Sequence, residues 1–142
     1  MKSVMRYVYP IILIVVIILT YIVFMDSSTY FGQYINLVAI CFMLIATIFI
    51  QIATGDIGYF FKSFVNTKDN RNKKAIAIKH TMVAWMLSGI LYFLLYLIDV
   101  YHIVDGVLID NVAMSLNSIL YGVIGVLMLY PSKIYFEQND TK

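Results

Sequence analysis

The sequence predicts an all-α integral membrane protein with four transmembrane helices and both termini on the cytoplasmic side. Of its 142 residues, 62% are hydrophobic and 13% are charged, whereas a soluble domain averages roughly 45–50% apolar and about 25% charged residues. The apolar residues gather in four long runs, and the mean hydropathy is +0.87. All ten Lys and Arg residues lie outside these runs, in segments assigned to one side of the bilayer.

Each apolar run is close to the ~20 residues that a helix needs to cross a hydrocarbon core about 30 Å thick. None alternates polar and apolar residues as a membrane strand does, so helices are the expected spanning form. The predicted spans are Tyr9–Met25, Ile35–Thr54, Met82–Ile98 and Val112–Tyr130. Residues 1–142 are therefore expected to form one membrane domain.

The basic residues predict the orientation of the four spans. They precede the first span, occupy the loop Phe61–His80 and follow the fourth span, while the other two connections carry no Lys or Arg. This positive-inside pattern predicts cytoplasmic N- and C-termini and a cytoplasmic loop at about 61–80. The expected location is the plasma (inner) membrane. We also expect the second span to extend as an amphipathic helix through Phe64, and the third helix to begin early, within Lys73–His80.

No Asp, Glu, Lys, Arg or His lies in the middle of a predicted span. An ionisable residue at that depth would mark a functional site, and membrane enzymes need such an acid or base. Cys41 is the only cysteine, which excludes an intrachain disulfide, and we expect it to be a small buried hydrophobe. The sequence thus predicts no catalytic, metal or cofactor site, no enzyme activity and no nucleic-acid partner.

Small and weakly polar residues recur at steps of three and four along the fourth span, which places them on one helix face. They are Asn111, Ser115, Ser118, Gly122 and Gly125. One interpretation is close helix packing with hydroxyls that bond across the interface. The other is a pore lining made by Ser88, Asn111, Ser115, Ser118 and Gly122, and the sequence leaves both open.

Two amides lie within the predicted spans, Gln51 and Asn117. Because an amide without a hydrogen-bond partner is costly in lipid, we expect both to point toward protein. Asp56 follows the second span, and we expect it to pair with Lys62 or Lys133.

The fourth span reads AMSLNSILYGVIGVLMLYPSK, in which a run of small residues and hydroxyls leads to Leu120-Tyr121-Gly122 and then Pro131. This resembles the final-helix motif of the MotA/TolQ/ExbB proton-channel family. The stretch YINLVAICFMLIATIFIQ is similar to the entry into the second helix of the MotA branch. The order of elements also agrees: two helices, a cytoplasmic segment and two more helices.

The resemblance implies a homopentamer whose last two helices line a central channel. It also implies a MotB/ExbD-like single-span partner that threads this channel and supplies the proton-carrying carboxylate, with Ser118 in place of a channel threonine. The chain departs from the family where Ser88-Gly89 replaces the third-helix Gly-Thr signature and where Ile119 stands at the second threonine position. It also lacks the large cytoplasmic domain, so it resembles a short, divergent MotA-like member.

Two functions follow as hypotheses. The first is a stator-like or ion-channel subunit, homopentameric and acting with the single-span partner. The second is a non-conducting membrane scaffold or assembly protein that uses its small-residue faces only for packing. The transported ion and the physiological process are not encoded in any recognisable motif.

Overall fold

The computed structural model describes residues 2–24, 35–65, 69–101 and 108–138, and these are helical with no strand. Five helices follow one another along the described chain. They are α1 (Lys2–Phe24), α2 (Leu37–Ala53), α3 (Ile57–Val65), α4 (Arg71–Tyr101) and α5 (Leu108–Glu137).

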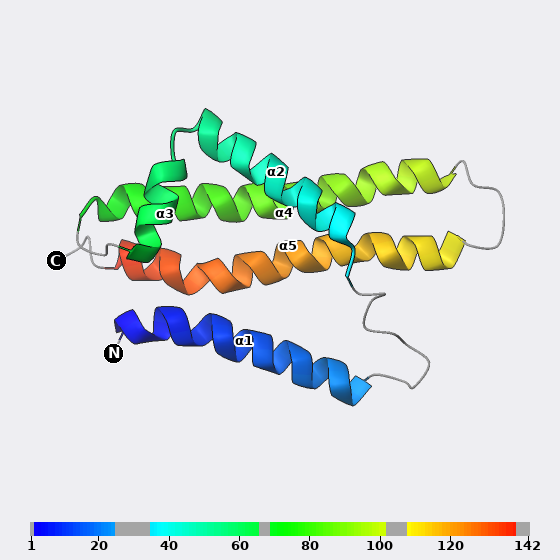
Figure 1. Ribbon diagram of the computed structural model, residues 1–142, viewed down its shortest axis with the longest axis horizontal. Helices are drawn as coiled ribbons and strands as arrows, with labels where there is room; N and C mark the ends of the chain where they lie inside the picture. The colour runs from blue at the N-terminus through cyan, green and yellow to red at the C-terminus, as the bar shows by residue number, and fades with distance from the viewer. Residues whose placement is uncertain (1, 25–34, 66–68, 102–107, 139–142) are drawn as a thin grey trace.

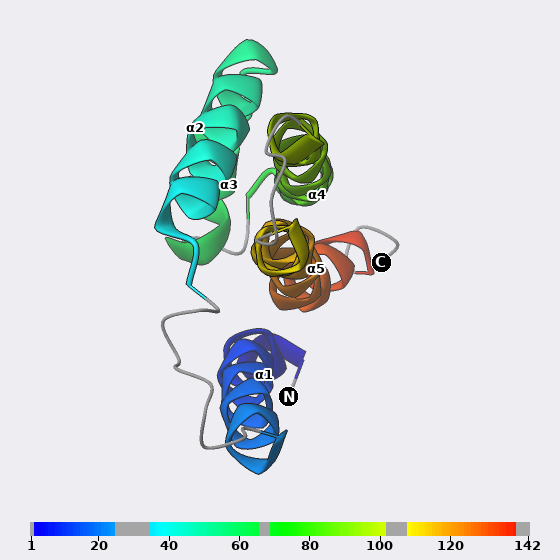
Figure 2. The same cartoon turned by 90° about the vertical axis from the view of Figure 1, so that its right-hand side faces the viewer.

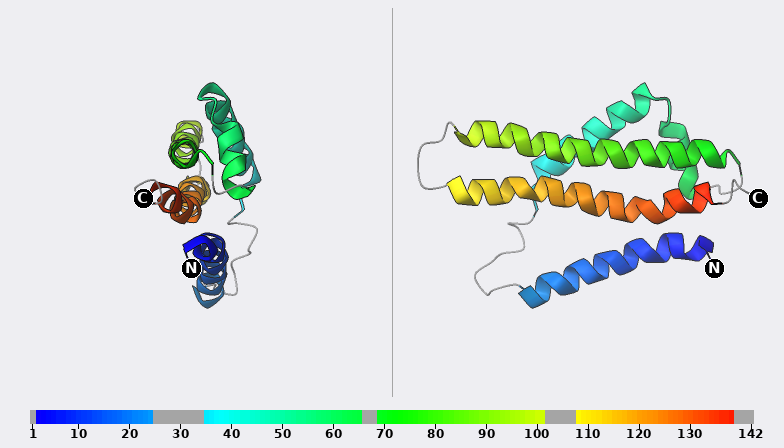
Figure 3. Two further views of the ribbon diagram at one scale, coloured as in Figure 1. Left: turned by 90° about the vertical axis from the view of Figure 1, so that its left-hand side faces the viewer. Right: turned by 180° about the vertical axis from the view of Figure 1, so that it is seen from behind.

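The two longest helices, α4 and α5, run side by side as an antiparallel hairpin (Figure 1). Seen end-on, α1, α5 and α4 follow one another in one layer, and α2 and α3 lie across α4 (Figure 2). The view from behind shows α1 on the opposite side of α5 from α4 (Figure 3). The start of α1 is tied to α3, since the Tyr7 hydroxyl donates a hydrogen bond to the Phe64 carbonyl over 2.9 Å.

Two described helices are long and apolar enough to cross a membrane, at Arg71–Ile98 and Ser115–Glu137. There are three if the bent pair α2–α3 counts as one span, and α1 contains a shorter apolar stretch, Tyr7–Leu19. Large apolar side chains are exposed along all of these helices, as is consistent with a membrane protein. The helical class is confirmed, while the four-span topology stays a prediction.

The chain bends sharply after α2, where the sequence predicted a continuous helix through Phe64. The Thr54 side chain and backbone N–H both bond the Ile50 carbonyl, and Gly55 adopts φ +71°. A left-handed glycine just after the last turn is a common helix stop. As a result α3 leaves α2 at 104°, so the predicted extension is wrong in direction although α3 is a helix.

The α3 end of the molecule has its own hydrophobic cluster. Ala75, Ile78, Met82 and Phe136 are buried there, with Phe60 of α3 packed against them. Three residues of this cluster belong to the N-terminal part of α4, which begins at Arg71. This agrees with the prediction that the third helix begins before its membrane span, within Lys73–His80. The buried Lys74 places its Nζ 5.8 Å from the centre of the Phe136 ring, within cation–π range.

Candidate functional site

The serine row of α5 lies in the seam between α4 and α5. Ser115 and Ser118 are both 0% exposed within a single chain. Ser118 Oγ lies 2.9 Å from the Gly89 carbonyl of α4 and 2.8 Å from the Ser115 carbonyl, so its one proton can go to either. Hydroxyl bonding across a helix interface is the packing interpretation of this row.

Glycines let α4 and α5 approach closely in this seam. A Cβ on Gly89 would lie 2.5 Å from the Ser118 carbonyl oxygen, and one on Gly125 would lie 2.3 Å from Trp85 Nε1. Gly122 faces Met86, whose Sδ would lie 3.1 Å from an added Cβ. Each distance is shorter than ordinary van der Waals contact, so the closeness of the seam depends on these residues.

The remaining residues of the predicted pore lining do not form one set with the buried serines. Ser88 is 3% exposed, and its hydroxyl donates to the Trp85 carbonyl of its own helix over 3.0 Å. Asn111 belongs to α5, but its side chain lies outside the described residues. The structure therefore brings Ser118 and Gly122 of α5 against α4, while the buried Ser88 bonds only within its own helix.

Tyr121, from the Leu-Tyr-Gly motif, connects three helices. Its hydroxyl accepts the backbone N–H of Asn36 over 2.8 Å at the start of α2, where the Asn36 side chain caps the helix by accepting from Ala39 N–H. Its carbonyl accepts from Trp85 Nε1 of α4 over 2.8 Å. Pro131 lies inside α5 and has no backbone N–H to donate to the preceding turn.

The two amides expected to point toward protein do so. Gln51 is 3% exposed and Asn117 is 8% exposed. Gln51 Nε2 donates to the Ala77 carbonyl over 3.0 Å and also to Thr81 Oγ1. The Gln51 Oε1 atom is buried and has no hydrogen-bond partner among the residues that the structure describes.

Asp56 pairs with His80, not with Lys62 or Lys133 as expected. His80 Nδ1 lies 2.5 Å from Asp56 Oδ2, at the corner where α2 ends and α3 begins. Lys133 instead lies 3.4 Å from Glu137, one turn further along α5. The sequence could not place this corner because it depends on the bend at Gly55.

Cys41 is exposed on α2, so its expected burial in the protein is wrong. The apolar character of the thiol suits a lipid-facing position as well as a core position.

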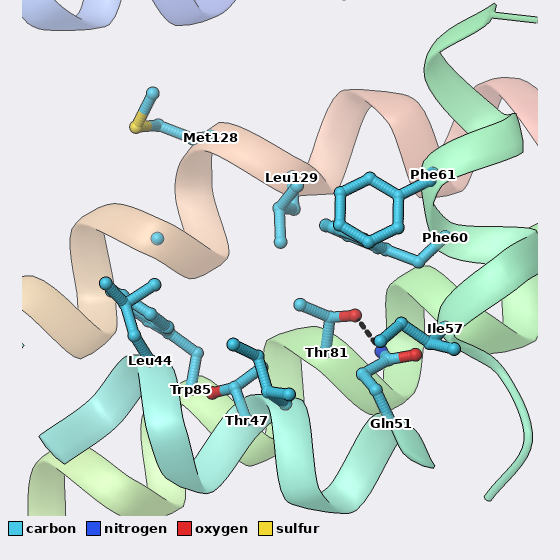
Figure 4. A pocket seen from close by; sticks show the side chains of 12 residues that line it. Leu44, Thr47, Gln51, Ile57, Phe60, Phe61, Thr81, Trp85, Met128 and Leu129 are labelled. Atoms are coloured by element: carbon cyan, nitrogen blue, oxygen red, sulfur yellow. Dashed lines mark hydrogen bonds between the residues drawn. The ribbon is translucent and has the colours of Figure 1, made fainter. Parts of the chain in front are cut away.

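A cavity of about 400 Å³ lies between α2, α3, α4 and α5. Figure 4 shows Leu44, Thr47 and Gln51 of α2 across the cavity from Leu129 of α5, with Phe60 and Phe61 of α3 at one end. Thr81 and Trp85 of α4 also line it. No motif in the sequence pointed to this cavity, although Thr81 and Trp85 are four residues apart and so share one face of α4.

These features define an all-helical protein in its described part, with two or three helices long and apolar enough to span a membrane, a closely packed α4–α5 pair and a ligand-sized cavity. No model of a known protein family, no curated protein and no solved structure matches the chain. The function is therefore argued from the geometry of the hairpin and of the cavity.

Proposed function

We propose that the protein is a non-conducting membrane scaffold in which the α4–α5 hairpin is the fixed central element. The observation that carries this proposal is the complete burial of Ser115 and Ser118 within one chain. A side chain that is buried between two helices of the same subunit cannot also face a channel at the centre of an oligomer unless the hairpin repacks. In this arrangement the Ser118 hydroxyl bonds across the interface to the Gly89 carbonyl, and the Ser115 hydroxyl donates to the Val112 carbonyl of its own helix.

A stator-like or ion-channel subunit is the second candidate, working as a pentamer with a single-span partner. The side-by-side arrangement of α4 and α5 favours it (Figure 1), because the resemblance implies paired last helices around a channel. Tyr121, Gly122 and Pro131 lie on α5, as this reading requires. Native mass spectrometry from mild detergent tests the assembly: a pentamer favours this candidate, and a monomer or dimer favours the scaffold.

The two candidates give opposite predictions for Ser118→Leu. If Ser118 packs the seam, the larger side chain overpacks a site that is 0% exposed, and the free energy of unfolding falls by about 1–3 kcal/mol. If Ser118 lines a pore, the variant assembles normally and only ion flow stops. Thermal unfolding in detergent, followed by circular dichroism, measures the difference.

Val123→Leu is the matched control, because Val123 lies on the same helix and is 39% exposed. We expect its stability to stay within about 0.5 kcal/mol of the native protein. Flux into liposomes alone does not decide between the candidates, since a stator-like subunit without its partner is also silent. A Ser118→Leu protein as stable as the control would overturn the scaffold proposal.

We also propose that the protein lies in the plasma (inner) membrane with both termini in the cytoplasm. Its support is the distribution of charge. The start of α1, the end of α5 and the start of α4 all lie at one end of the molecule (Figure 1). The Lys and Arg residues that the structure describes belong to the start of α1, to α3, to the start of α4 and to the end of α5, as the positive-inside rule requires of a cytoplasmic face.

A further inference from the structure

The short helix α3 lies crosswise to the α4–α5 hairpin, at the end of the hairpin where α4 begins (Figures 1 and 3). It leaves α2 at 104°, and its Phe60 packs against a cluster that includes Ala75 and Met82 of α4. A helix that lies across a membrane-spanning hairpin runs in the plane of the bilayer. This orientation requires only that α4 crosses the bilayer, and it is independent of the scaffold proposal.

The contacts of α3 with α4 place it at the depth of the lipid headgroups. The cluster against which Phe60 packs runs along α4 from Ala75 to Met82, which is about 10 Å at 1.5 Å per residue. The predicted span of α4 begins at Met82, so the cluster extends outward from the edge of the hydrocarbon core. The headgroup layer there is roughly 5–8 Å thick. Amphipathic helices bind in the membrane plane at this depth.

The two sides of α3 differ in chemistry. The side chains of α3 that line the cavity are Ile57, Phe60 and Phe61. At about 100° per residue, they are centred on one side of the helix, and Tyr59 and Lys62 are centred on the other. The cavity is also lined by Leu44 of α2 and Trp85 of α4, which lie within predicted spans. The cavity side of α3 therefore faces the hydrocarbon core, and the Tyr59 and Lys62 side faces away from it.

An apolar stripe at the edge of the cavity side is left uncovered by the protein. Phe61 and Val65 are four residues apart and share a face of α3, and they are 63% and 88% exposed. In water such a stripe would be unfavourable, whereas the boundary between headgroups and acyl chains would cover it. Tyr7, whose hydroxyl bonds the Phe64 carbonyl of α3, is of the residue type that is enriched at this boundary.

The opposite side of α3 carries positive charge. Lys62 is exposed there. The exposed Lys73, from the start of α4, donates to the Tyr59 hydroxyl over 3.3 Å, with its Nζ 5.3 Å from the centre of the Tyr59 ring. Among the residues that the structure describes, neither lysine pairs with a carboxylate. Two ammonium groups at headgroup depth complement the phosphates of anionic lipids.

We propose that α3 is an interfacial helix that docks the basic end of the protein on anionic phospholipid. Phe61 and Val65 enter the boundary between headgroups and acyl chains, and the Lys62 and Lys73 ammonium groups bind the lipid phosphates. The bilayer that surrounds the hairpin is thus also the partner of α3, and the site prefers anionic over zwitterionic headgroups.

Spin labels on the two sides of α3 test its placement. Val65→Cys and Lys62→Cys are made separately in a Cys41→Ser background, labelled with a nitroxide and placed in nanodiscs that contain phosphatidylglycerol. We expect the label at Val65 to collide more with oxygen, which concentrates in the acyl layer, and the label at Lys62 to collide more with a water-soluble nickel complex. Equal preferences at the two positions, or the reverse pattern, would overturn the proposal.

The charge preference is tested by native mass spectrometry of the protein in mild detergent, titrated with phosphatidylglycerol and with phosphatidylcholine. We expect Lys62→Gln and Lys73→Gln each to lower the ratio of the two affinities about fivefold. Lys133→Gln is the matched control, because Lys133 lies at the same end of the molecule and is already 3.4 Å from Glu137. Its ratio should change less than about twofold. If either of the first two variants behaved like this control, the assignment of the phosphates to Lys62 and Lys73 would be wrong.

Discussion

Single glycines set the distance between α4 and α5. Gly125 leaves room for the Trp85 indole, since an added Cβ would lie 2.3 Å from Trp85 Nε1. Gly58 of α3 has no atom within 4 Å of the corresponding position. Substituting each glycine by alanine therefore distinguishes the loss of close packing at Gly125 from the general effect of glycine on helix stability at Gly58.

Gly125→Ala should displace the indole from its hydrogen bond to Tyr121. We expect the free energy of unfolding to fall by about 1–3 kcal/mol, as in other overpacked sites, and the emission of Trp85 to shift. The control Gly58→Ala should stabilise α3 by up to about 1 kcal/mol, because alanine is the better helix former. Thermal unfolding in detergent compares them, and a Gly125→Ala protein as stable as Gly58→Ala would contradict the tight seam.

Tyr121→Phe removes only the hydroxyl that accepts the Asn36 N–H. We expect a loss of about 1 kcal/mol in stability, with faster hydrogen exchange at the first turn of α2. Tyr130→Phe, at a position that is 48% exposed on the same helix, should leave both measurements unchanged. Equal exchange in the two variants would argue against the Tyr121 connection.

At the residue scale, the sequence predicted burial better than it predicted partners. Gln51 and Asn117 were identified because an amide in an apolar span has a known desolvation penalty. Periodicity showed that Ser115 and Ser118 share a face, but their burial within a single chain could be seen only with the neighbouring helix in place. The Asp56–His80 pair joins residues 24 positions apart, which no local pattern encodes.

At the scale of elements, the turn between α2 and α3 decides which side chains line the cavity. Without the 104° bend, α3 would continue the direction of α2 and Phe60 could not reach the hydrophobic cluster at the start of α4. In the sequence, the bend is marked only by Gly55 and the Asp56 that follows it. In the structure, Gly55 adopts φ +71°. A continuous helix was predicted because the apolar pattern of the segment runs on through Phe64, and a single glycine was not taken as the end of the helix.

Gly55→Ala should loosen the bend, because a left-handed backbone is unfavourable for a residue with a Cβ by roughly 1–2 kcal/mol. We expect hydrogen exchange to rise across α3 while α5 stays protected. Gly55→Asn is the matched comparison, since asparagine tolerates the left-handed region, and it should resemble the native protein. If alanine and asparagine behaved alike, the bend would not depend on the backbone conformation of Gly55.

At the scale of the whole molecule, the helical class and the positions of the main helices followed from composition and apolar runs. The third and fourth predicted spans lie inside α4 and α5, because long apolar runs need no tertiary information to be recognised. The packing order of the helices was not predictable in the same way. It depends on interhelical bonds such as those of Tyr121 and Tyr7.

The proposed orientation can be checked by cysteine labelling in a Cys41→Ser background. Asn72→Cys, at the exposed start of α4, should react with a membrane-impermeant maleimide only after the cells are permeabilised. Ser28→Cys, in the predicted outer loop, should react in intact cells. The reverse pattern would overturn cytoplasmic termini.

The lengths of the helices differ greatly around the molecule. At 1.5 Å per residue, the 17 residues of α2 extend about 26 Å, while the 31 residues of α4 extend about 46 Å. α2 also runs obliquely to the α4–α5 hairpin (Figure 1), which shortens its reach along the hairpin axis. The predicted span Met82–Ile98 within α4 also has 17 residues, so the apolar lengths of α2 and α4 match. Most of the extra length of α4 is its basic start, Arg71–Thr81, which at 1.5 Å per residue would extend about 16 Å beyond the apolar layer on the proposed cytoplasmic side.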